Sequence, residues 1–273
     1  LVTVHDLSYV RVPECFPAVL KNYLDRAVPR ALRRADLVLA DAASTARDLQ
    51  DVYGLPPDRI KVLYSGVDGS FGGQVTEEDQ ARVRQKYDLR GPYLLSVGTL
   101  QPRKNYARLI QAFAQVVSNG GPAAPPFPTL KLVIAGGQGW MYDEVYATVA
   151  RLGLGDRVVF TGFTPDADLP ALYALATLLV YPSLYEGFGL PVAEAMACGA
   201  PVVSSNASSL PEVAGDAAVY FDPRDVDAMA AAIRGALVDE SLRRRLSDRG
   251  RVQVRQFTWE RAAAQLLEYL TGS

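Results

Sequence analysis

Short apolar runs recur along the middle of the chain at intervals that fit the strands of a sheet. Each run is rich in Val, Ile, Leu or Tyr and stops at glycine, proline or small polar residues. The pattern predicts strands at Tyr93–Val97, Leu130–Ala135, Arg157–Phe160, Leu178–Tyr181, Pro201–Ser204 and Ala218–Phe221. Since helical patterns separate most of these runs, the sequence predicts repeated strand–helix units and a parallel sheet covered on both faces.

Between the strands, the apolar residues change to helical spacing. In the clearest segment, Asn105 to Val117, they recur three and four positions apart and form one stripe. Ser209 and Glu212 have the spacing of a capping box, which predicts a single helical turn ended by Gly215. Gly120–Pro128 is predicted as a surface loop. The other predicted helices are Tyr142–Leu152, Leu169–Ala176, Val192–Ala197, Asp225–Val238, Ser241–Gln256 and Trp259–Leu270, the last capped by Thr258.

The first 66 residues repeat these patterns on a smaller scale. Strands are predicted at Leu1–Val4, Leu37–Ala40 and Ile60–Tyr64, and helices at Cys15–Arg34 and from a capping Ser44 to Tyr53. The next stretch, Ser65–Gly73, holds four glycines and is typical of an interdomain hinge. The segment before it is short for a doubly wound domain, because domains typically have about 100–150 residues.

The stretch from Leu178 to Gly199 has the organisation of a ligand site. A strand is followed by a glycine turn at Gly187–Gly189 and then by a helix, with one carboxylate before the turn, Glu186, and one inside the helix, Glu194. α/β proteins bind ligands at such turns, at the carboxyl ends of parallel strands. An ordinary loop with an acid that favours the helix dipole would explain Glu194 but not Glu186.

A second candidate loop follows the strand Tyr93–Val97. It carries two adjacent cations, Arg103 and Lys104, just before a helix begins. Cations at a helix N-terminus suit a phosphate or diphosphate, although two solvated side chains on a loop are a common alternative. The glycines of Gly136–Gly139 lack the spacing of a dinucleotide fingerprint.

Composition narrows the class of protein. The chain is 49% hydrophobic and 21% charged, as in globular proteins that bury a core. Its net charge of −2 does not favour nucleic acid as a partner. With one histidine in the chain, and with Cys15 and Cys198 far apart, no metal or redox motif is found. No apolar run is long enough to span a membrane, and the first residues are not those of a signal peptide.

The sequence around the glycine turn resembles a known family. EGFGLPVAE is similar to the E-x7-E signature of the retaining family 4 glycosyltransferases, which have the GT-B fold. VHDLS, SVGTLQPRKN, AGGQGW, VVFTGF, SSLPEVAG and FTWERAA resemble further motifs of that family, in the same order. The resemblance covers nearly the whole chain. It implies an α/β protein with two Rossmann-like doubly wound parallel-sheet domains, the first incomplete.

The resemblance also implies how the chain divides. Residues 1–66 would be the C-terminal part of an acceptor-side domain, and residues 67–257 the domain that binds the nucleotide-sugar. Residues 258–273 would be a helix that crosses back to the first domain. The family's first domain begins with strands and a glycine-rich loop that nothing before Leu1 supplies. The chain is therefore expected to bind a nucleoside diphosphate, to transfer sugar poorly, and to associate through its N-terminal segment.

Roles for the candidate residues follow from the resemblance. Arg103 and Lys104 match the basic pair that neutralises the donor diphosphate, with no metal ion, as the glycosyl bond breaks. Glu186 matches the acid that hydrogen-bonds donor-sugar hydroxyls, and Glu194 the acid that binds the ribose. His5 matches a histidine that faces the anomeric carbon, but without the rest of its domain it could equally be an ordinary loop histidine. The other predicted donor-binding residues are Gly98, Thr99, Phe163, Thr164, Gly187, Phe188, Gly189 and Leu190.

The activity implied is transfer of a hexosyl group, with retention, from a nucleotide-diphospho-sugar to a glycan or lipid-linked acceptor, without a cofactor. The AGGQGW segment resembles that of mannosyltransferase-like members of the family, and this resemblance favours GDP-mannose. A front-face transfer is preferred to attack by Glu186 as a nucleophile. Replacing Glu186 by Gln is expected to stop transfer and leave the fold intact, since a loop acid need not support packing.

Two other classes of function stay open. One is a non-catalytic subunit that binds nucleotide-sugars. The other is a different GT-B enzyme, such as a sugar-nucleotide epimerase or a phosphorylase, although no motif indicates the pyridoxal-phosphate lysine that a phosphorylase needs. A cytoplasmic location is expected, with peripheral association at the inner membrane face through a region upstream of these residues.

Overall fold

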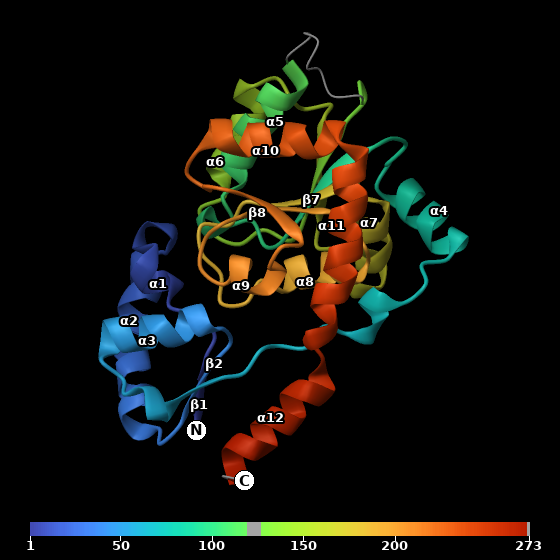
Figure 1. Ribbon diagram of the computed structural model, residues 1–273. Coiled ribbons are helices and arrows are strands. Elements are labelled where there is room, and N and C mark those ends of the chain that lie inside the picture. The colour runs from blue at the N-terminus through green and yellow to red at the C-terminus, as the bar shows by residue number, and fades with distance from the viewer. Residues whose placement is uncertain (119–126, 272–273) are drawn as a thin grey trace.

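The chain forms two parallel sheets, seen in a computed structural model that describes residues 1–118 and 127–271 (Figure 1). The first sheet consists of neighbouring strands β1 (Val2–Val4), β2 (Val38–Ala40) and β3 (Ile60–Val62). The second consists of β4 (Tyr93–Val97), β5 (Lys131–Ala135), β6 (Val158–Gly162), β7 (Leu178–Tyr181), β8 (Val202–Ser205) and β9 (Ala218–Phe221). All strand pairs among the described residues are parallel. The predicted α/β class and the positions of the predicted strands are therefore confirmed.

The strand order of the second sheet reverses at its centre, which is where open α/β sheets have their ligand crevice. The order is β6-β5-β4-β7-β8-β9, so the chain builds outward from β4 to one edge, returns, and builds outward again from β7. The loops that follow β4 and β7 leave the same end of neighbouring strands and continue in opposite directions. Ligands of open α/β sheets bind at this point of reversal.

Helices cover both faces of the second sheet (Figure 1). One layer contains α5 (Tyr106–Ser118), α6 (Asp143–Arg151) and α10 (Val226–Val238). The other contains α7 (Leu169–Leu175), α8 (Leu190–Ala197) and α9 (Leu210–Ala214), with α11 (Glu240–Gln253) against α8. Within β4, Leu94 faces the first layer and its neighbour Leu95 faces the second, and both are fully buried. The strands have to be apolar throughout because each of their faces is covered.

In the N-terminal part (residues 1–66), α1 (Ser8–Arg11), α2 (Ala18–Arg34) and α3 (Ala43–Tyr53) pack on the first sheet. α2 starts later than predicted because Pro13–Cys15 form a separate 3-10 turn. The prediction that Ser44 caps α3 is wrong. The backbone N–H groups of Ala43 and Ser44 donate instead to Glu212 of the main part (residues 67–257), at 2.6 and 3.2 Å.

The predicted capping box of α9 is wrong for the same reason. α9 lies where the sequence predicts it and ends at Gly215, but Ser209 Oγ donates to carbonyl groups of another loop while Glu212 reaches α3. Spacing alone could not reveal these partners, because Glu212 and Ala43 are 169 positions apart. Thr258 does cap α12 (Trp259–Thr271), since its Oγ1 accepts from Arg261 N at 3.2 Å. The predicted loop at 120–128 lies, as far as residue 126, outside the described residues.

Among the described residues two helices, α1 and α4 (Glu77–Lys86), escaped prediction, and α4 did so because it has no apolar stripe. Val83 is its buried residue, and polar contacts hold the rest. Asp168, which is itself buried, accepts from Lys86 Nζ at 2.6 Å and from Tyr87 Oη at 2.7 Å, and it also pairs with Arg82. Burial would raise the pKa of Asp168, but these partners hold it at about 2. The buried carboxylate of Asp168 therefore holds α4 on the rest of the main part.

The N-terminal part and the main part meet where two segments cross. Val67 N donates to Phe257 O at 3.0 Å, and Gly66 lies against the start of α12. A Cβ atom at Gly66 would stand 2.4 Å from the backbone nitrogen of Trp259. α12 then runs back along the first sheet, where Tyr269 Oη donates to Val62 O at 2.9 Å (Figure 1). Gly66, the first glycine of the predicted hinge, therefore allows the two segments to pack closely at this crossing.

Replacing Gly66 by alanine is expected to destabilise the protein by about 1–3 kcal/mol, because the added methyl group meets backbone that cannot rotate away. Urea unfolding of the variant measures this change. Gly69→Ala is the matched control, since a Cβ there meets none of the described atoms within 4 Å. Equal unfolding free energies for the two variants would contradict the contact between Gly66 and α12.

Candidate functional site

The loops that follow β4 and β7 are joined where they leave the sheet. The first folds into a 3-10 turn, Pro102–Lys104, and the second contains Ser183, Leu184 and Glu186. Leu184 N donates to Arg103 O at 2.9 Å, and Ser183 Oγ lies 3.1 Å from the same carbonyl oxygen. Two segments far apart in the sequence thus form one surface at the crevice of the sheet.

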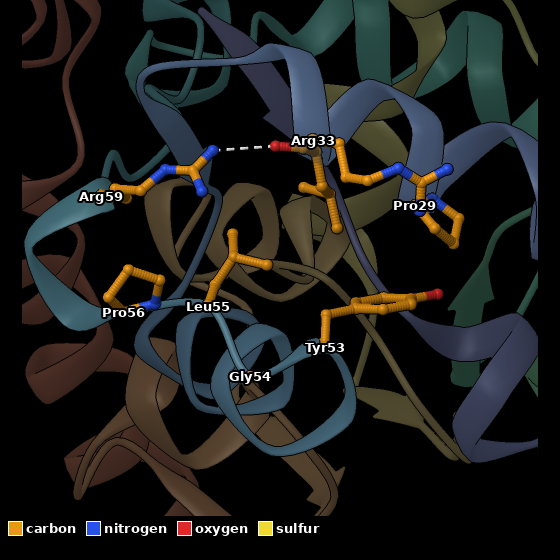
Figure 2. Close-up of a pocket in the computed structure, with 8 residues that line it drawn as sticks. Pro29, Arg33, Tyr53, Gly54, Leu55, Pro56 and Arg59 are labelled. Atoms are coloured by element: carbon orange, nitrogen blue, oxygen red, sulfur yellow. Dashed lines mark hydrogen bonds between the residues drawn. The ribbon is translucent and has the colours of Figure 1, made fainter.

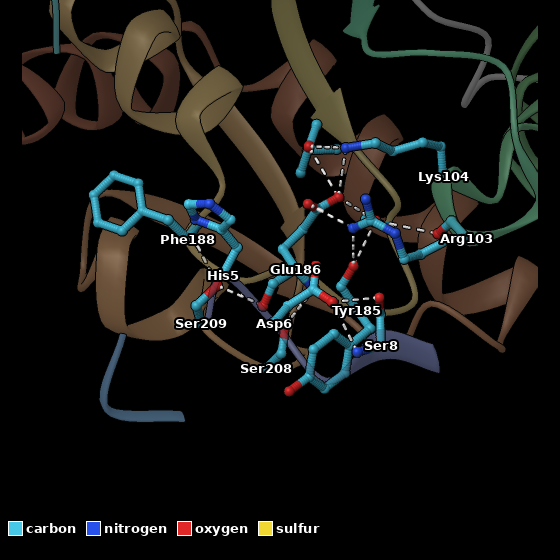
Figure 3. A network of polar contacts seen from close by, with 12 residues as sticks. His5, Asp6, Ser8, Arg103, Lys104, Tyr185, Glu186, Phe188, Ser208 and Ser209 are labelled. Atoms are coloured by element: carbon cyan, nitrogen blue, oxygen red, sulfur yellow. Dashed lines mark hydrogen bonds and ion pairs between the residues drawn. The ribbon is translucent and has the colours of Figure 1, made fainter. Parts of the chain in front are cut away.

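At the centre of this surface Glu186 binds both predicted cations (Figure 3). Arg103 Nη1 lies 2.8 Å from Glu186 Oε2, and Lys104 Nζ lies 2.7 Å from Oε1. Tyr181 Oη and Ser183 Oγ also donate to Oε1, at 3.0 and 2.5 Å. The structure brings together the three residues on which the predicted chemistry depends most.

The charges of this cluster are buried and compensate one another. Each of the three side chains is at most 13% exposed. Burial alone would raise the pKa of Glu186, but the positive charges of Lys104 and Arg103 hold it at about 2. Burial also lowers the pKa of Lys104, against the attraction of Glu186. Glu186 is therefore an ionised, ion-paired carboxylate, and the three side chains together keep one positive charge.

These contacts correct the expectation that Glu186 does not support the fold. The side chain accepts bonds from four others, and its backbone N–H donates to Ser208 Oγ at 2.7 Å. Removing one member of a buried ion pair strands the charge of its partner. A variant at Glu186 must be expected to lose stability as well as chemistry.

The glycine turn after Glu186 is packed closely on the N-terminal part. A Cβ at Gly187 would lie 2.1 Å from His5 O, so only glycine allows this approach. Gly189 has a φ of +100° at the start of α8 and lies against Leu210. Phe188 is buried, with its ring centroid 5.1 Å from that of Phe257. Leu190 is exposed.

The backbone carbonyl group of His5 lies against Gly187, while the His5 side chain is 80% exposed. His5 Nδ1 is 2.8 Å from Asp41 Oδ2, a contact within the N-terminal part. Gly98 lies next to Lys104, because a Cβ there would be 3.1 Å from Lys104 Cε. Thr99, which follows it, is exposed.

Glu194, on α8, is held by a residue that the sequence did not indicate. Tyr173 of α7 is fully buried, and its Oη donates to Glu194 Oε2 at 2.8 Å. Burial raises the pKa of Glu194, against the effect of this hydrogen bond. The sequence predicts only a helix over Leu169–Ala176 around Tyr173, so the fold alone reveals that its hydroxyl group orients the acid.

Phe163 and Thr164 lie apart from the ionic cluster, after β6 at one edge of the sheet. Phe163 is 81% exposed, and Thr164 is buried, with its Oγ1 2.8 Å from that of Thr161. The nearby Asp166 acts electrostatically on Glu194. In the strand order, β5 lies between β6 and β4, the strand whose loop carries Arg103 and Lys104.

Asn105 is a further site residue whose role the sequence did not indicate. Its φ is +61°, and its Nδ2 donates to Pro182 O at 3.0 Å and to Pro223 O at 2.7 Å. Asparagine tolerates this left-handed conformation better than most residues. Asn105 thereby ends the turn that carries Arg103 and Lys104 and fixes it on the neighbouring loop.

A separate hollow in the N-terminal part does not belong to this site (Figure 2). It has a volume of about 180 Å³ and is lined by Pro29, Leu32, Arg33, Tyr53, Gly54, Leu55, Pro56 and Arg59. Ligand pockets usually have about 300–1,000 Å³. Arg59 Nη2 donates to Leu32 O at 2.9 Å and so satisfies the end of α2. We therefore attribute this hollow to the way α2 packs on its neighbours, and not to a ligand.

Residues 1–118 and 127–271, which the structure describes, contain neither a metal-binding cluster nor a membrane-spanning helix. No group of three or more histidine, cysteine, aspartate or glutamate residues in them is arranged to hold a metal ion. No helix in them is long and apolar enough to cross a membrane.

Comparison with known proteins shows what the chain is similar to. The family model for glycosyl transferases group 1 matches residues 77–253, and that for glycosyltransferase family 4 matches residues 1–71. The chain is 37% identical to the O-antigen chain mannosyltransferase B of Escherichia coli, over 98% of this chain and 68% of that protein. It is 34% identical to the serotype-specific mannosyltransferase WbdA of Escherichia coli, over 87% of this chain and 29% of that protein. The chain thus spans only part of each relative.

Solved structures show the same architecture. Sucrose-phosphate synthase from Thermosynechococcus elongatus matches 99% of this chain, and 67% of its own, with a TM-score of 0.80 and 26% identity. Anabaena HepE in complex with UDP-glucose matches 100% of this chain, and 72% of its own, with a TM-score of 0.82 and 26% identity. These neighbours confirm the predicted GT-B fold class.

Glu186→Gln is expected to lower the free energy of unfolding by about 3–5 kcal/mol at neutral pH, because it strands two buried cations. Since folding lowers the pKa of Glu186 from 4.5 to about 2, the advantage of the wild type is complete above pH 4.5 and disappears as the pH falls toward 2. Urea unfolding as a function of pH measures it. Glu144→Gln, which alters an exposed pair with Arg151, serves as the control and should cost less than about 1 kcal/mol. A pH-independent difference would contradict the ionised state of Glu186.

Proposed function

The chain belongs to the group 1 glycosyl transferases of family 4, and on this basis we propose that it transfers a hexosyl group from a nucleotide-diphospho-sugar, with retention, to a glycan or lipid-linked acceptor. The observation that carries the proposal is the position of Glu186 between Arg103 and Lys104, at the crevice of the second sheet. The residues that resemble the family's catalytic motifs thus converge on one side of the glycine turn.

The two cations can bind a diphosphate without giving up Glu186. Among the described contacts, Arg103 uses Nη1 for Glu186 and for Tyr185 O, so its Nε and Nη2 can still donate. Lys104 Nζ donates to Glu186 and Tyr181 and keeps a third hydrogen. Charge-assisted bonds from both would stabilise the diphosphate as it takes the electron pair of the breaking glycosyl bond. No metal ion is needed in this step.

The bonding of Glu186 supports a front-face transfer. Both carboxylate oxygens already accept hydrogen bonds from cations, and such a carboxylate is a poor nucleophile. In the step proposed, the bond from the anomeric carbon to the diphosphate oxygen breaks and the acceptor oxygen bonds to that carbon from the same face. The acceptor proton passes to the departing diphosphate. Glu186 hydrogen-bonds the donor sugar, and His5, beside the turn, faces the anomeric carbon.

GDP-mannose is the proposed donor. Two relatives that are 37% and 34% identical to this chain over the aligned residues are named as mannosyltransferases, one of them for an O-antigen chain. The names support mannose as the sugar and a glycan as the acceptor. Glu194 would bind the ribose, with Phe163 and Thr164 near the base and Gly98, Thr99 and the backbone from Gly187 to Leu190 near the diphosphate and sugar. An intracellular site of action at the inner membrane face is part of the proposal.

We propose further that the N-terminal part and the main part are separate domains, with α12 as the helix that returns to the first. The separate sheets and the contact of Tyr269 with Val62 support this division. The other two classes of function, a non-catalytic binding subunit and another GT-B enzyme, differ from a transferase in turnover. A transferase should release GDP only when an acceptor is present, whereas a binding subunit or another GT-B enzyme should not.

A thermal-shift panel of GDP-mannose, GDP-glucose, UDP-glucose and dTDP-glucose tests the donor. GDP-mannose at a hundred times its dissociation constant should stabilise the chain by about 2.7 kcal/mol, more than any of the other three. Stabilisation by a UDP- or dTDP-sugar alone would reject GDP-mannose but keep the site. No shift with any nucleotide-sugar would contradict donor binding by this chain.

The double variant Arg103→Met, Lys104→Met should bind GDP about 10- to 100-fold more weakly for each cation lost, and guanosine about as well as the wild type, because each cation contributes one charged hydrogen bond to phosphate. Isothermal titration calorimetry with both ligands measures the difference. Arg90→Met, Lys131→Met removes two cations at the opposite end of β4 and β5 and should change neither affinity. Equal losses for GDP and guanosine would place the pair away from the diphosphate.

A further inference from the structure

The segment Ser208–Glu212 contacts the glycine turn and the N-terminal part at the same time. On the side of the turn, Ser208 Oγ accepts from Glu186 N at 2.7 Å. Ser209 Oγ donates to Phe188 O at 2.8 Å, with Glu186 O at 3.1 Å. The side chain of Leu210 fills the space beside Gly189. The segment Ser208–Glu212 therefore holds the backbone of the glycine turn in its conformation.

Ser208 shows how tightly the segment is tied to the turn. Its φ is +49°, in the left-handed region, which costs a residue with a Cβ about 1–2 kcal/mol. Such a conformation persists where surrounding contacts determine it. The hydrogen bond from Glu186 N to Ser208 Oγ is one such contact. A shift of the segment would therefore also displace the backbone at Glu186.

On the opposite side, Glu212 binds the first turn of α3 in the N-terminal part. Its Oε1 accepts from Ala43 N at 2.6 Å and from Tyr64 Oη at 2.5 Å, and its Oε2 accepts from Ser44 N at 3.2 Å. α3 has no capping side chain of its own among the described residues. A carboxylate at a helix N-terminus is favoured both by the free N–H groups and by the helix dipole.

We propose that Glu212 is a positioning residue that couples contact between the two parts to the shape of the glycine turn. The inference rests on the proposed function, since the turn and His5 would face the same donor sugar. When α3 lies on Glu212, the segment Ser208–Glu212 is held, and with it the backbone of Glu186 and Phe188. When α3 moves away, Glu212 loses its partners and the turn loses its support. Closure and assembly of the sugar site are then one event.

A purely local cap would behave differently. If Glu212 served only to end α3, its loss would loosen the first turn of α3 and leave the glycine turn as it was. Hydrogen exchange of two peptides separates these cases, one covering residues 42–50 and the other residues 183–190. This readout needs neither substrate nor turnover, so it tests the coupling even if the proposed donor is wrong.

In the unliganded chain, Glu212→Gln should speed exchange about fivefold or more in both peptides, because the variant keeps the shape but loses the charge and one acceptor. Tyr64→Phe, which removes one donor to Glu212, should act on both peptides in the same direction but less. Glu240→Gln is the control, because Glu240 pairs on the surface with Arg244 and should change neither peptide. Faster exchange confined to residues 42–50, or in neither peptide, would overturn the coupling.

Saturating GDP-mannose should slow exchange in both peptides of the wild type. In Glu212→Gln it should slow exchange in residues 183–190 alone. In turnover assays the same variant should lose kcat at least about tenfold and keep its KM for the donor within about threefold, because the donor is held mainly by Arg103, Lys104 and Glu194. Equal protection of residues 42–50 in variant and wild type would overturn the proposal. Absence of any effect of GDP-mannose on the wild type would count against the proposed donor and leave the unliganded comparison decisive.

Discussion

Glu186 is a charge enclosed by protein, and a buried charge requires partners of opposite sign and hydrogen bonds to all its oxygens. Arg103 and Lys104 supply the charge, and Tyr181 and Ser183 supply further hydrogen bonds. These residues come from the ends of β4 and β7, so the requirement of a single carboxylate ties together the two loops that flank the crevice of the sheet. The cations are thereby fixed in place, and under the proposed function they would stabilise the leaving diphosphate without reorganising.

The same site depends on contact with the N-terminal part. Gly187 lies directly on the His5 carbonyl, and Phe188 packs with Tyr64 and Phe257 where the two parts cross. A donor sugar next to the turn would therefore touch both parts of the protein. Glu212 adds a polar link at the same boundary, because its carboxylate caps a helix that lies across it.

The sequence predicted the elements that depend on local periodicity. Strands buried on both faces are continuous apolar runs, and Arg103, Lys104 and Glu186 follow strands whose ends share one edge, so their convergence could be foreseen. Contacts between distant residues could not. The spacing of Ser209 and Glu212 indicated a local capping box, yet Glu212 caps α3, and Tyr173 orients Glu194 from another helix. α4 was missed because buried Asp168, and not an apolar stripe, holds it. The burial of Glu186 was missed because a loop acid is usually solvated.

A crystal structure of the chain with GDP-mannose would test the central claim most directly. The account predicts diphosphate oxygens within about 2.7–3.2 Å of Arg103 and Lys104, with a sugar hydroxyl donating to Glu186 and the ribose at Glu194. The ion pairs between Glu186 and the two cations should remain. A diphosphate bound away from both cations, for example at the hollow beside Arg33 and Arg59, would contradict it.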